Sequence, residues 1–291
     1  MLIYIYGIKF DSDYAPVIQS LLERMVQRGI QVSIFEEFER FLTTQFLMPE
    51  HSTFGATTNF EGVDALFSIG GDGTLLDAAT LIGSRAIPVL GFNTGRLGFL
   101  SHVSIAEVDA ALDLFITGEY EIERRSLIHV QSNQFEFGHF PYALNEVTIN
   151  NASRNEMINV HASIDGKFLS NYWADGLIIA TPTGSTAYSL SCGGPIVTPE
   201  CKNFILTPIS AHNLTARPLV IGDSCEVQLK ATSRNGNILI TLDSEPFVLE
   251  SGCEIILAKA PFELHMILLK GRNFFRTIRK KMGWGLDIRQ D

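Results

Sequence analysis

Blocks of apolar residues with the lengths of strands and helices alternate along the first third of the chain. Short apolar runs predict strands at 2–8, 32–38, 63–69 and 87–92. Apolar residues that recur every three or four positions predict helices at 16–28, at 74–82 and from Ser104 to about 117. Ser104 and Glu107 have the spacing of a capping box, and the Thr- and Gly-rich segment 51–61 is predicted to be a surface loop.

The pattern changes at about residue 124, where short strand-like runs follow one another without helical spacing. They predict strands at 127–131, 143–149, 158–164, 176–180, 224–230, 238–242 and 253–257. Asp165-Gly166 and Asn235-Gly236 predict hairpin turns. Helical spacing returns at 273–282, where we expect Phe274, Phe275 and Ile278 to anchor a last helix to the first domain.

These patterns predict an α/β N-terminal domain with a doubly wound, mostly parallel sheet, followed by an all-β sandwich, α+β overall. We predict domains at 1–123, completed by the C-terminal helix 267–291, and at 124–266. The chain of 291 residues, 46% of them hydrophobic, is long enough for two such cores.

Composition narrows the function classes. The net charge of −10 argues against a nucleic-acid binder, which would carry a basic face. No apolar run is long enough to span a membrane, and the N-terminus lacks the basic region of a signal peptide, so we expect no membrane association and a cytoplasmic location. The four cysteines form no Cys-x-x-Cys pair, which predicts buried, reduced thiols and no metal site built by the protein.

Residues 70–74, Gly-Gly-Asp-Gly-Thr, connect a predicted strand to a predicted helix and are the most informative turn on the chain. A glycine-rich turn at a helix N-terminus leaves backbone N–H groups for an anion and lets it approach closely. Asp72 would repel that anion unless it takes a proton or orients a hydroxyl group or a metal.

Simpler interpretations of this turn exist. Asp72 could be an ordinary N-cap. A Walker A loop is excluded because no lysine follows, and the Rossmann fingerprint is excluded because its third glycine is missing.

Three further blocks are rich in small and polar residues. Asn93–Leu100 follows the next predicted strand and is either a plain connection or a second wall of the anion site, with Arg96 supplying charge. Asn145-Glu146 places an amide and a carboxylate in an apolar strand, which is costly unless both are satisfied or face solvent. Residues 175–195 run from a buried strand into a turn whose glycines and hydroxyl groups suggest close contact with a polar ligand.

Together, in order and over most of the chain, these blocks resemble the NAD kinase family, bacterial type. The matching segments are 70–74, 93–100, Asn145-Glu146, Asp175-Gly176, 181–191 and Gly193-Gly-Pro195, and residues 275–284 resemble the family's C-terminal helix. Segment 70–74 is shared with lipid kinases, whereas segment 181–195 is far more specific.

The resemblance implies an active site between the two domains and transfer of the γ-phosphoryl group of ATP to the 2′-hydroxyl of the adenosine ribose of NAD, giving NADP. Asp72 would be the catalytic base. Residues implied to bind NAD are Asp72, Gly73, Asn145, Glu146, Asp175, Thr186, Ala187, Tyr188, Ser189, Leu190, Ser191 and Glu245. Residues expected to hold the phosphates of ATP are Gly70, Gly71, Gly73, Thr74 and Arg96. Mg²⁺ would bridge the ATP phosphates, and the resemblance implies a homodimer or homotetramer.

The chain departs from the family pattern at Asp243-Ser244-Glu245, where many members have Asp-Gly-Gln. A carboxylate cannot donate a hydrogen bond as a glutamine amide does, which puts the role of Glu245 in doubt. Two other functions stay open: a diacylglycerol-type lipid kinase with the same glycine turn, and a non-catalytic dinucleotide-binding protein.

Overall fold

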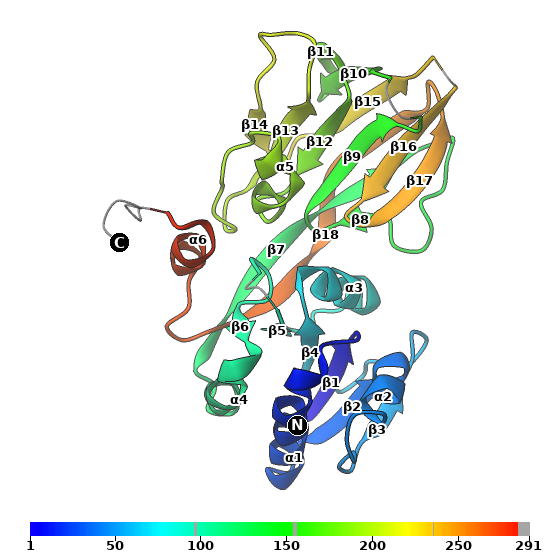
Figure 1. The fold of residues 1–291 in the computed structure, drawn as a ribbon. Helices are drawn as coiled ribbons and strands as arrows, with labels where there is room; N and C mark the ends of the chain where they lie inside the picture. Colours follow the sequence, from blue (N-terminus) through cyan, green and yellow to red (C-terminus); the bar gives the residue numbers. More distant parts are fainter. Residues whose placement is uncertain (96–97, 154–155, 235, 285–291) are drawn as a thin grey trace. The chain divides into compact units, whose positions relative to one another are not determined.

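The structure is a computed structural model that describes residues 1–95, 98–153, 156–234 and 236–284 (Figure 1). Its internal contacts divide the chain into two compact units. Unit 1 comprises Met1–Arg124 together with the chain from Leu264 onward, and unit 2 comprises Arg125–Glu263. The chain passes between the units within two long strands, β7 (Tyr120–Gln131) and β18 (Glu254–Leu269).

Unit 1 is built on a parallel sheet with the strand order β5-β4-β1-β2-β3. The strands are β1 (Leu2–Gly7), β2 (Gln31–Phe35), β3 (Ser52–Phe54), β4 (Ala65–Gly70) and β5 (Val89–Asn93). The short β6 (Val103–Ser104) and the last part of β18 both pair with β5. All six residues of β4 are buried, as expected for a central strand covered on both faces.

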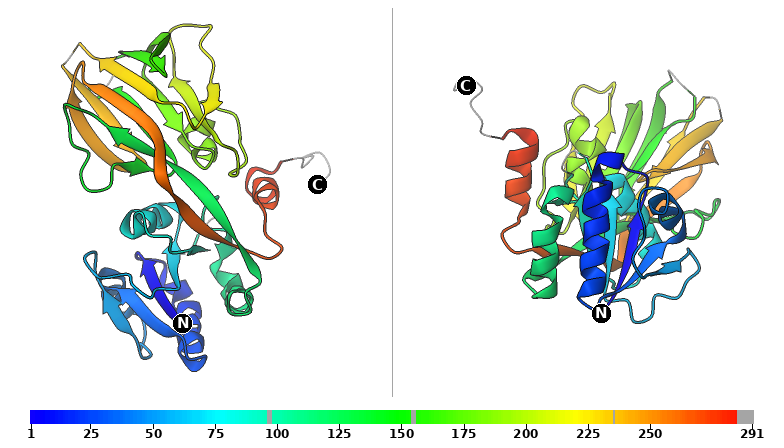
Figure 2. Two further views of the ribbon diagram at one scale, coloured as in Figure 1. Left: turned by 180° about the vertical axis from the view of Figure 1, so that it is seen from behind. Right: turned by 60° about the horizontal axis from the view of Figure 1, so that its bottom comes forward.

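Helices cover both faces of this sheet, which confirms the doubly wound arrangement. Helices α1 (Ala15–Gln27) and α4 (Val108–Ile116) lie side by side and bury their apolar residues in one core with the sheet (Figure 2). Helix α3 (Asp72–Ile82) packs on the opposite face, where Leu75 lies against Gly91 of β5. Unit 1 also contains α2 (Glu36–Leu42), α6 (Phe274–Met282) and 3₁₀ turns at Ser12–Tyr14 and Ile105–Glu107.

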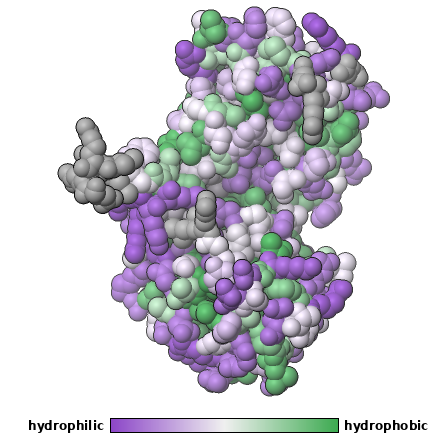
Figure 3. All heavy atoms as spheres, viewed as in Figure 1, coloured by the Kyte–Doolittle hydropathy of each residue, from purple (hydrophilic) through white to green (hydrophobic). Residues whose placement is uncertain are grey.

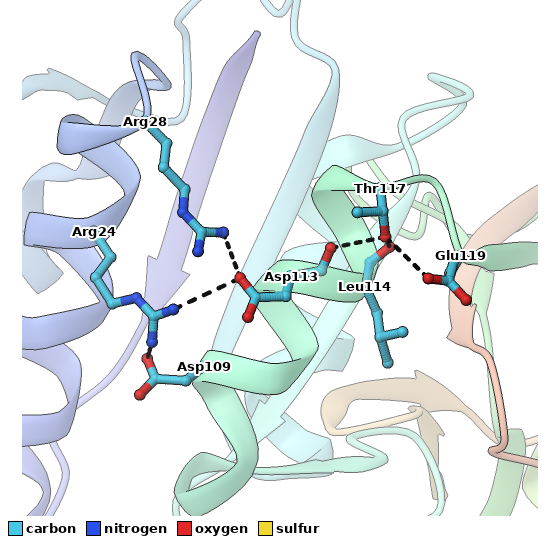
Figure 4. A network of polar contacts seen from close by, with 7 residues as sticks. All are labelled: Arg24, Arg28, Asp109, Asp113, Leu114, Thr117 and Glu119. Carbon is cyan, nitrogen blue, oxygen red and sulfur yellow. Dashed lines mark hydrogen bonds and ion pairs between the residues drawn. The ribbon is translucent and has the colours of Figure 1, made fainter.

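Ion pairs join α1 to α4 on the surface of unit 1 (Figure 4). Arg24 pairs with Asp109, and Arg28 lies 2.5 Å from Asp113. Thr117, after the end of α4, donates to the Asp113 carbonyl at 2.9 Å. Exposed pairs of this kind contribute about 0.2–1 kcal/mol each to stability, so the buried apolar residues stabilise the contact between the helices more than the ion pairs do.

Unit 2 is a β-sandwich, as expected. One sheet has the order β14-β13-β12-β9-β16-β17, and the other joins β11, β10, β15 and β18, with β7 beside β18 and β8 beside β7. The bounds are β8 (Tyr142–Ala143), β9 (Glu146–Asn151), β10 (Ile158–Ile164), β11 (Lys167–Ala174), β12 (Gly176–Ala180), β13 (Asn203–Ile209), β14 (Leu219–Gly222), β15 (Val227–Thr232), β16 (Asn237–Leu242) and β17 (Glu245–Glu250). Alternate apolar residues of both sheets fill one core, and the 3₁₀ turn Gly184–Thr186 and helix α5 (Tyr188–Ser191) follow β12.

Three sequence-based predictions about elements need correction. The run 32–38 is not one strand, because Glu36–Leu42 forms helix α2 and buries Phe38 and Leu42, one turn apart, in the core. The predicted loop 51–61 contains the edge strand β3, whose Phe54 is buried. The run 143–149 is broken between β8 and β9 at Leu144 and Asn145, whose N–H groups bond to a side chain.

The predictions for the last helix and for the cysteines are correct only in part. In α6, Ile278 is buried and Phe274 is half-buried, but Phe275 is 59% exposed and does not anchor the helix. Among the cysteines, Cys253 is buried and Cys201 is exposed. All four are free thiols.

Within the described part of the chain, no helix is both long and apolar enough to cross a membrane. On the face drawn in Figure 3, hydrophobic and hydrophilic residues are interspersed.

Candidate functional site

Asp72 lies at the carboxyl edge of the unit 1 sheet, as the glycine turn predicts. It is the first residue of α3, directly after the end of β4. Gly70, the last residue of β4, is in register with Asn93, the last residue of β5, so the turns that follow both strands share one edge. Ligands of parallel α/β sheets bind at this edge.

The Asp72 carboxylate accepts three consecutive backbone N–H groups from the second turn. Phe99 N–H lies 2.8 Å from Oδ2, and Leu100 and Ser101 N–H lie 3.1 and 2.9 Å from Oδ1. The N-cap of α3 is Gly71, so the side chain of Asp72 does not cap its own helix. A carboxylate offers about four acceptor positions. The one position left is on Oδ2 of this half-buried residue.

The glycines around Asp72 have two different roles. A Cβ on Gly98 would lie 1.8 Å from Asp72 Oδ1, so this residue must be glycine for the carboxylate to keep its place. A Cβ on Gly71 or Gly73 would meet nothing within 4 Å. Packing therefore does not require glycine there, and the backbone is bare where an anion could approach the N–H groups of the first turn of α3.

The other residues predicted to hold phosphate contribute differently or lie outside the described residues. Thr74 is buried, and its hydroxyl lies against Gly70, so only its backbone faces the helix N-terminus. Arg96 lies outside the described residues.

In unit 2, the Asp243 carboxylate accepts backbone N–H groups at the break between β8 and β9, as Asp72 does in the loop after β5. Asp243 follows β16, in a two-residue connection to β17, and has a left-handed φ of 51°. Its carboxylate accepts the N–H groups of Leu144, Asn145 and Glu146 at 2.8, 2.8 and 3.1 Å. The side chain of Thr181 reinforces the break by donating to the Leu144 carbonyl at 2.5 Å.

Glu146, at the start of β9, is a buried carboxyl group that the protein only partly satisfies. It is 7% exposed and accepts the Tyr188 N–H, but its Oε2 has no hydrogen-bond partner among the described residues. Burial, and then the nearby negative charge of Asp243, raise the pKa of Glu146 to about 8. Burial likewise raises the pKa of Asp243 to about 6. An unsatisfied buried oxygen is costly, which makes Glu146 a candidate for contact with a ligand.

The raised pKa of Glu146 predicts a pH-dependent stability. Between pH of about 4.5 and about 8 the folded protein keeps a proton on Glu146 that the unfolded chain releases, so the free energy of unfolding falls as the pH rises. Glu146→Gln removes this dependence. We expect the melting temperature of Glu146→Gln minus that of the wild type to increase with pH up to about 8.

Glu245→Gln makes the same substitution at an exposed side chain and is the matched control. Its difference from the wild type should stay nearly constant over the same pH range. Parallel curves for Glu146→Gln and the wild type would contradict the assignment.

Tyr188 brings the other predicted residues of unit 2 together. Burial, and then the contact with Cys192, raise the pKa of the Tyr188 phenol, and the charges of Asp175 and Glu146 add to this effect. Asp175 is exposed between β11 and β12. The structure thus gathers Asn145-Glu146, Asp175 and the start of α5 in one cluster.

Within residues 186–191, the structure separates exposed from buried side chains. Tyr188 and Ser191 are exposed, and Thr186, Ala187 and Leu190 are half-buried. Ser189 is fully buried, and its hydroxyl bonds to the Thr207 hydroxyl at 2.8 Å. The Ser189 side chain therefore supports the turn from inside.

The motifs of the sequence include Asp243 and Thr181, but their supporting roles were not predicted. The signal for Asp243 was present: an aspartate in a two-residue connection between apolar strands has a side chain short enough to bond to nearby backbone. What the sequence did not reveal is which backbone it reaches, because Leu144 is 99 residues away.

Among the described residues, no group of three or more His, Cys, Asp or Glu side chains could hold a metal ion. The residues present fit a Mg²⁺ ion carried by the phosphates of a nucleotide, since Mg²⁺ is commonly held by phosphate, water and one or two carboxylates.

Comparisons with known proteins show the family of this chain. The ATP-NAD kinase N-terminal domain family matches residues 15–120, and the ATP-NAD kinase C-terminal domain family matches residues 144–269. The NAD kinase of Cytophaga hutchinsonii is 43% identical over 291 residues, covering 99% of this chain and 100% of the relative. The NAD kinase of Porphyromonas gingivalis is 40% identical over 288 residues, covering 99% of each chain.

Solved structures show the same fold. A yeast NADH kinase complexed with NADH matches with a TM-score of 0.90 at 24% identity, covering 100% of this chain and 89% of the other. An NAD kinase from Archaeoglobus fulgidus in complex with ATP matches with a TM-score of 0.75 at 26% identity, covering 97% and 99%. Both family models and full-length relatives therefore agree with the motifs, and the chain belongs to the NAD kinase family.

Proposed function

We propose that this protein is an NAD kinase, a phosphotransferase that moves the γ-phosphoryl group of ATP to the 2′-hydroxyl of the adenosine ribose of NAD. The observation that carries the proposal is Asp72, fixed by three amides beside a bare helix N-terminus, in a chain of this family.

In this proposal, the free position on Asp72 Oδ2 accepts the proton of the ribose hydroxyl. Phosphoryl transfer has a loose transition state, so the protein acts mainly by placing the hydroxyl in line and by stabilising charge. The first-turn N–H groups of α3, at Gly73 and Thr74, face the phosphates. Mg²⁺ bound with ATP would neutralise phosphate charge, and Asp72 is the carboxylate nearest to this turn.

We propose that the cluster in unit 2 holds NAD. Asn145 is half-buried, with its backbone fixed by Asp243 and Thr181, which leaves its side-chain amide free to recognise a ligand. Glu146 Oε2, Asp175 and the exposed part of residues 186–191 supply the other polar contacts. Ser189 would act only through its support of the turn, and the exposed Glu245 would contact NAD only as a hydrogen-bond acceptor.

The direct test supplies the purified protein with NAD and MgATP and measures NADP. Formation of NADP with turnover supports the proposal. Phosphorylation of diacylglycerol in place of NAD would identify a lipid kinase, and NAD binding without turnover would identify a non-catalytic dinucleotide-binding protein. The mass of the protein in solution would test the predicted homodimer or homotetramer.

Asn145→Ala and Asp175→Ala should each raise the KM for NAD more than the KM for ATP. Each substitution leaves a polar group of the ligand unpaired, which costs about 1–3 kcal/mol, or roughly 5- to 150-fold in KM. Steady-state kinetics with each substrate varied in turn measures both constants. Equal increases in the two KM values would count against the assignment to NAD.

A further inference from the structure

The loop segment 99–101, whose amides bond to Asp72, also contacts the C-terminal helix α6 of unit 1. Phe99, which donates its N–H to Asp72, is only 9% exposed. Lys281 Nζ of α6 lies 4.3 Å from the centre of that ring, and the ring of Phe274 lies 6.4 Å from it. An ammonium group over an aromatic face is attracted by the negative charge of the ring.

A second contact fixes the far end of the same loop. Arg272, just before α6, donates from Nη1 to the His102 carbonyl at 2.6 Å and from Nη2 to Glu107 at 3.0 Å. The guanidinium group therefore joins the residue after Ser101 to the 3₁₀ turn that precedes α4. The three amides on Asp72 thus lie in a short segment that is held at Phe99 and at His102.

The basic residues in and just before α6 do not all take part in this support. Arg272 and Lys281 contact the loop, whereas Arg276 and Arg279 make no contact with it among the described residues. The charge of Lys280 acts on Glu107, the partner of Arg272, whereas Arg279 makes no hydrogen bond, ion pair or ring contact among the described residues.

We propose that α6 is a positioning element for the catalytic base, with Lys281 and Arg272 holding the segment 98–102 whose amides orient Asp72. The proposal rests on the proposed kinase function of Asp72. Lys281 and Arg272 are positioning residues, since they act through Phe99 and His102. A small displacement of a catalytic group can cost as much as 10²-fold in rate, so a surface helix can influence turnover without touching a substrate.

The test compares charge reversal at two basic residues of α6. Lys281→Glu places a negative charge over the face of Phe99, and Arg279→Glu makes the same change in net charge two residues away. We expect Lys281→Glu to lower kcat about five- to tenfold with unchanged KM for NAD and ATP, and Arg279→Glu to keep kcat within about twofold. Lys281→Arg keeps the cation over the ring and should restore at least about half of the wild-type kcat.

A second measurement does not depend on activity. Hydrogen exchange of the amides of Phe99, Leu100 and Ser101 should be faster in Lys281→Glu than in Arg279→Glu, because these amides open when the support is lost. A wild-type protein that forms no NADP would refute the proposed function. The hydrogen-exchange rates would still show whether α6 stabilises the loop. With an active wild type, equal loss of kcat in the two variants, a rise in KM in place of a fall in kcat, or unchanged exchange at 99–101 would refute the inference.

Discussion

Asp72→Asn is expected to lower kcat by about 10²–10⁴-fold, the usual cost of losing a general base. Asparagine has nearly the same size but cannot accept the ribose proton. It also replaces one acceptor oxygen by an NH₂ group, which would face one of the amides of Phe99, Leu100 or Ser101. The variant should therefore also show faster hydrogen exchange at these three amides, although the core of unit 1 is untouched.

Asp77→Asn is the matched control, because Asp77 is exposed on the same helix and lies outside the proposed site. Its kcat should be unchanged. If Asp72→Asn kept more than about half of the wild-type kcat under the same conditions, Asp72 would not be the base.

Gly98→Ala is expected to lower kcat on the order of 10²-fold while leaving Asp72 chemically intact. The added Cβ would lie 1.8 Å from Oδ1 and 2.4 Å from Cγ of Asp72, so the carboxylate or the loop must move. The KM for NAD should change little, because the residues proposed to bind NAD in unit 2 are not altered.

A double-mutant cycle shows whether Gly98→Ala acts through Asp72. The variant carrying both Gly98→Ala and Asp72→Asn should be no slower than Asp72→Asn alone, since the displaced carboxylate is already lost. Additive losses would show that Gly98 serves the reaction by another route, such as direct contact with ATP.

Asp72 and Asp243 each accept three backbone N–H groups, and these hydrogen bonds fix the segments 99–101 and 144–146. Asp72 fixes the turn after β5, and Asp243 fixes the break between β8 and β9. In both cases a short carboxylate side chain orders a segment that has no helix or sheet partner of its own, as buried N–H groups require. Asp72 keeps one free acceptor position, which the proposed reaction would use, whereas the enclosed Asp243 fixes the backbone of Asn145 and Glu146.

The sequence by itself determined the classes of element and the region of the site. Period-2 and period-3.6 patterns located α1, α3 and most strands of the sandwich, because burial of one face imposes that spacing. The run of glycines around Asp72 predicted a strand-to-helix turn with an anion site, since backbone geometry at that point is local. The predicted strand 32–38 was wrong from Glu36 onward, where α2 begins. Phe38 and Leu42 both reach the core because a helix places them on the same face.

Only the tertiary structure decided which distant groups meet. Ser101 is 29 residues from Asp72, and Leu144 is 99 residues from Asp243, so no local pattern could show that their amides share one carboxylate. The same holds for Lys281 over Phe99, where the sequence indicated only a basic helix. The unsatisfied oxygen of Glu146 and its raised pKa also depend on burial, which is a property of the packed chain. Local spacing specifies what each segment can form, whereas contacts between distant segments decide which polar groups are satisfied and which are left for a ligand.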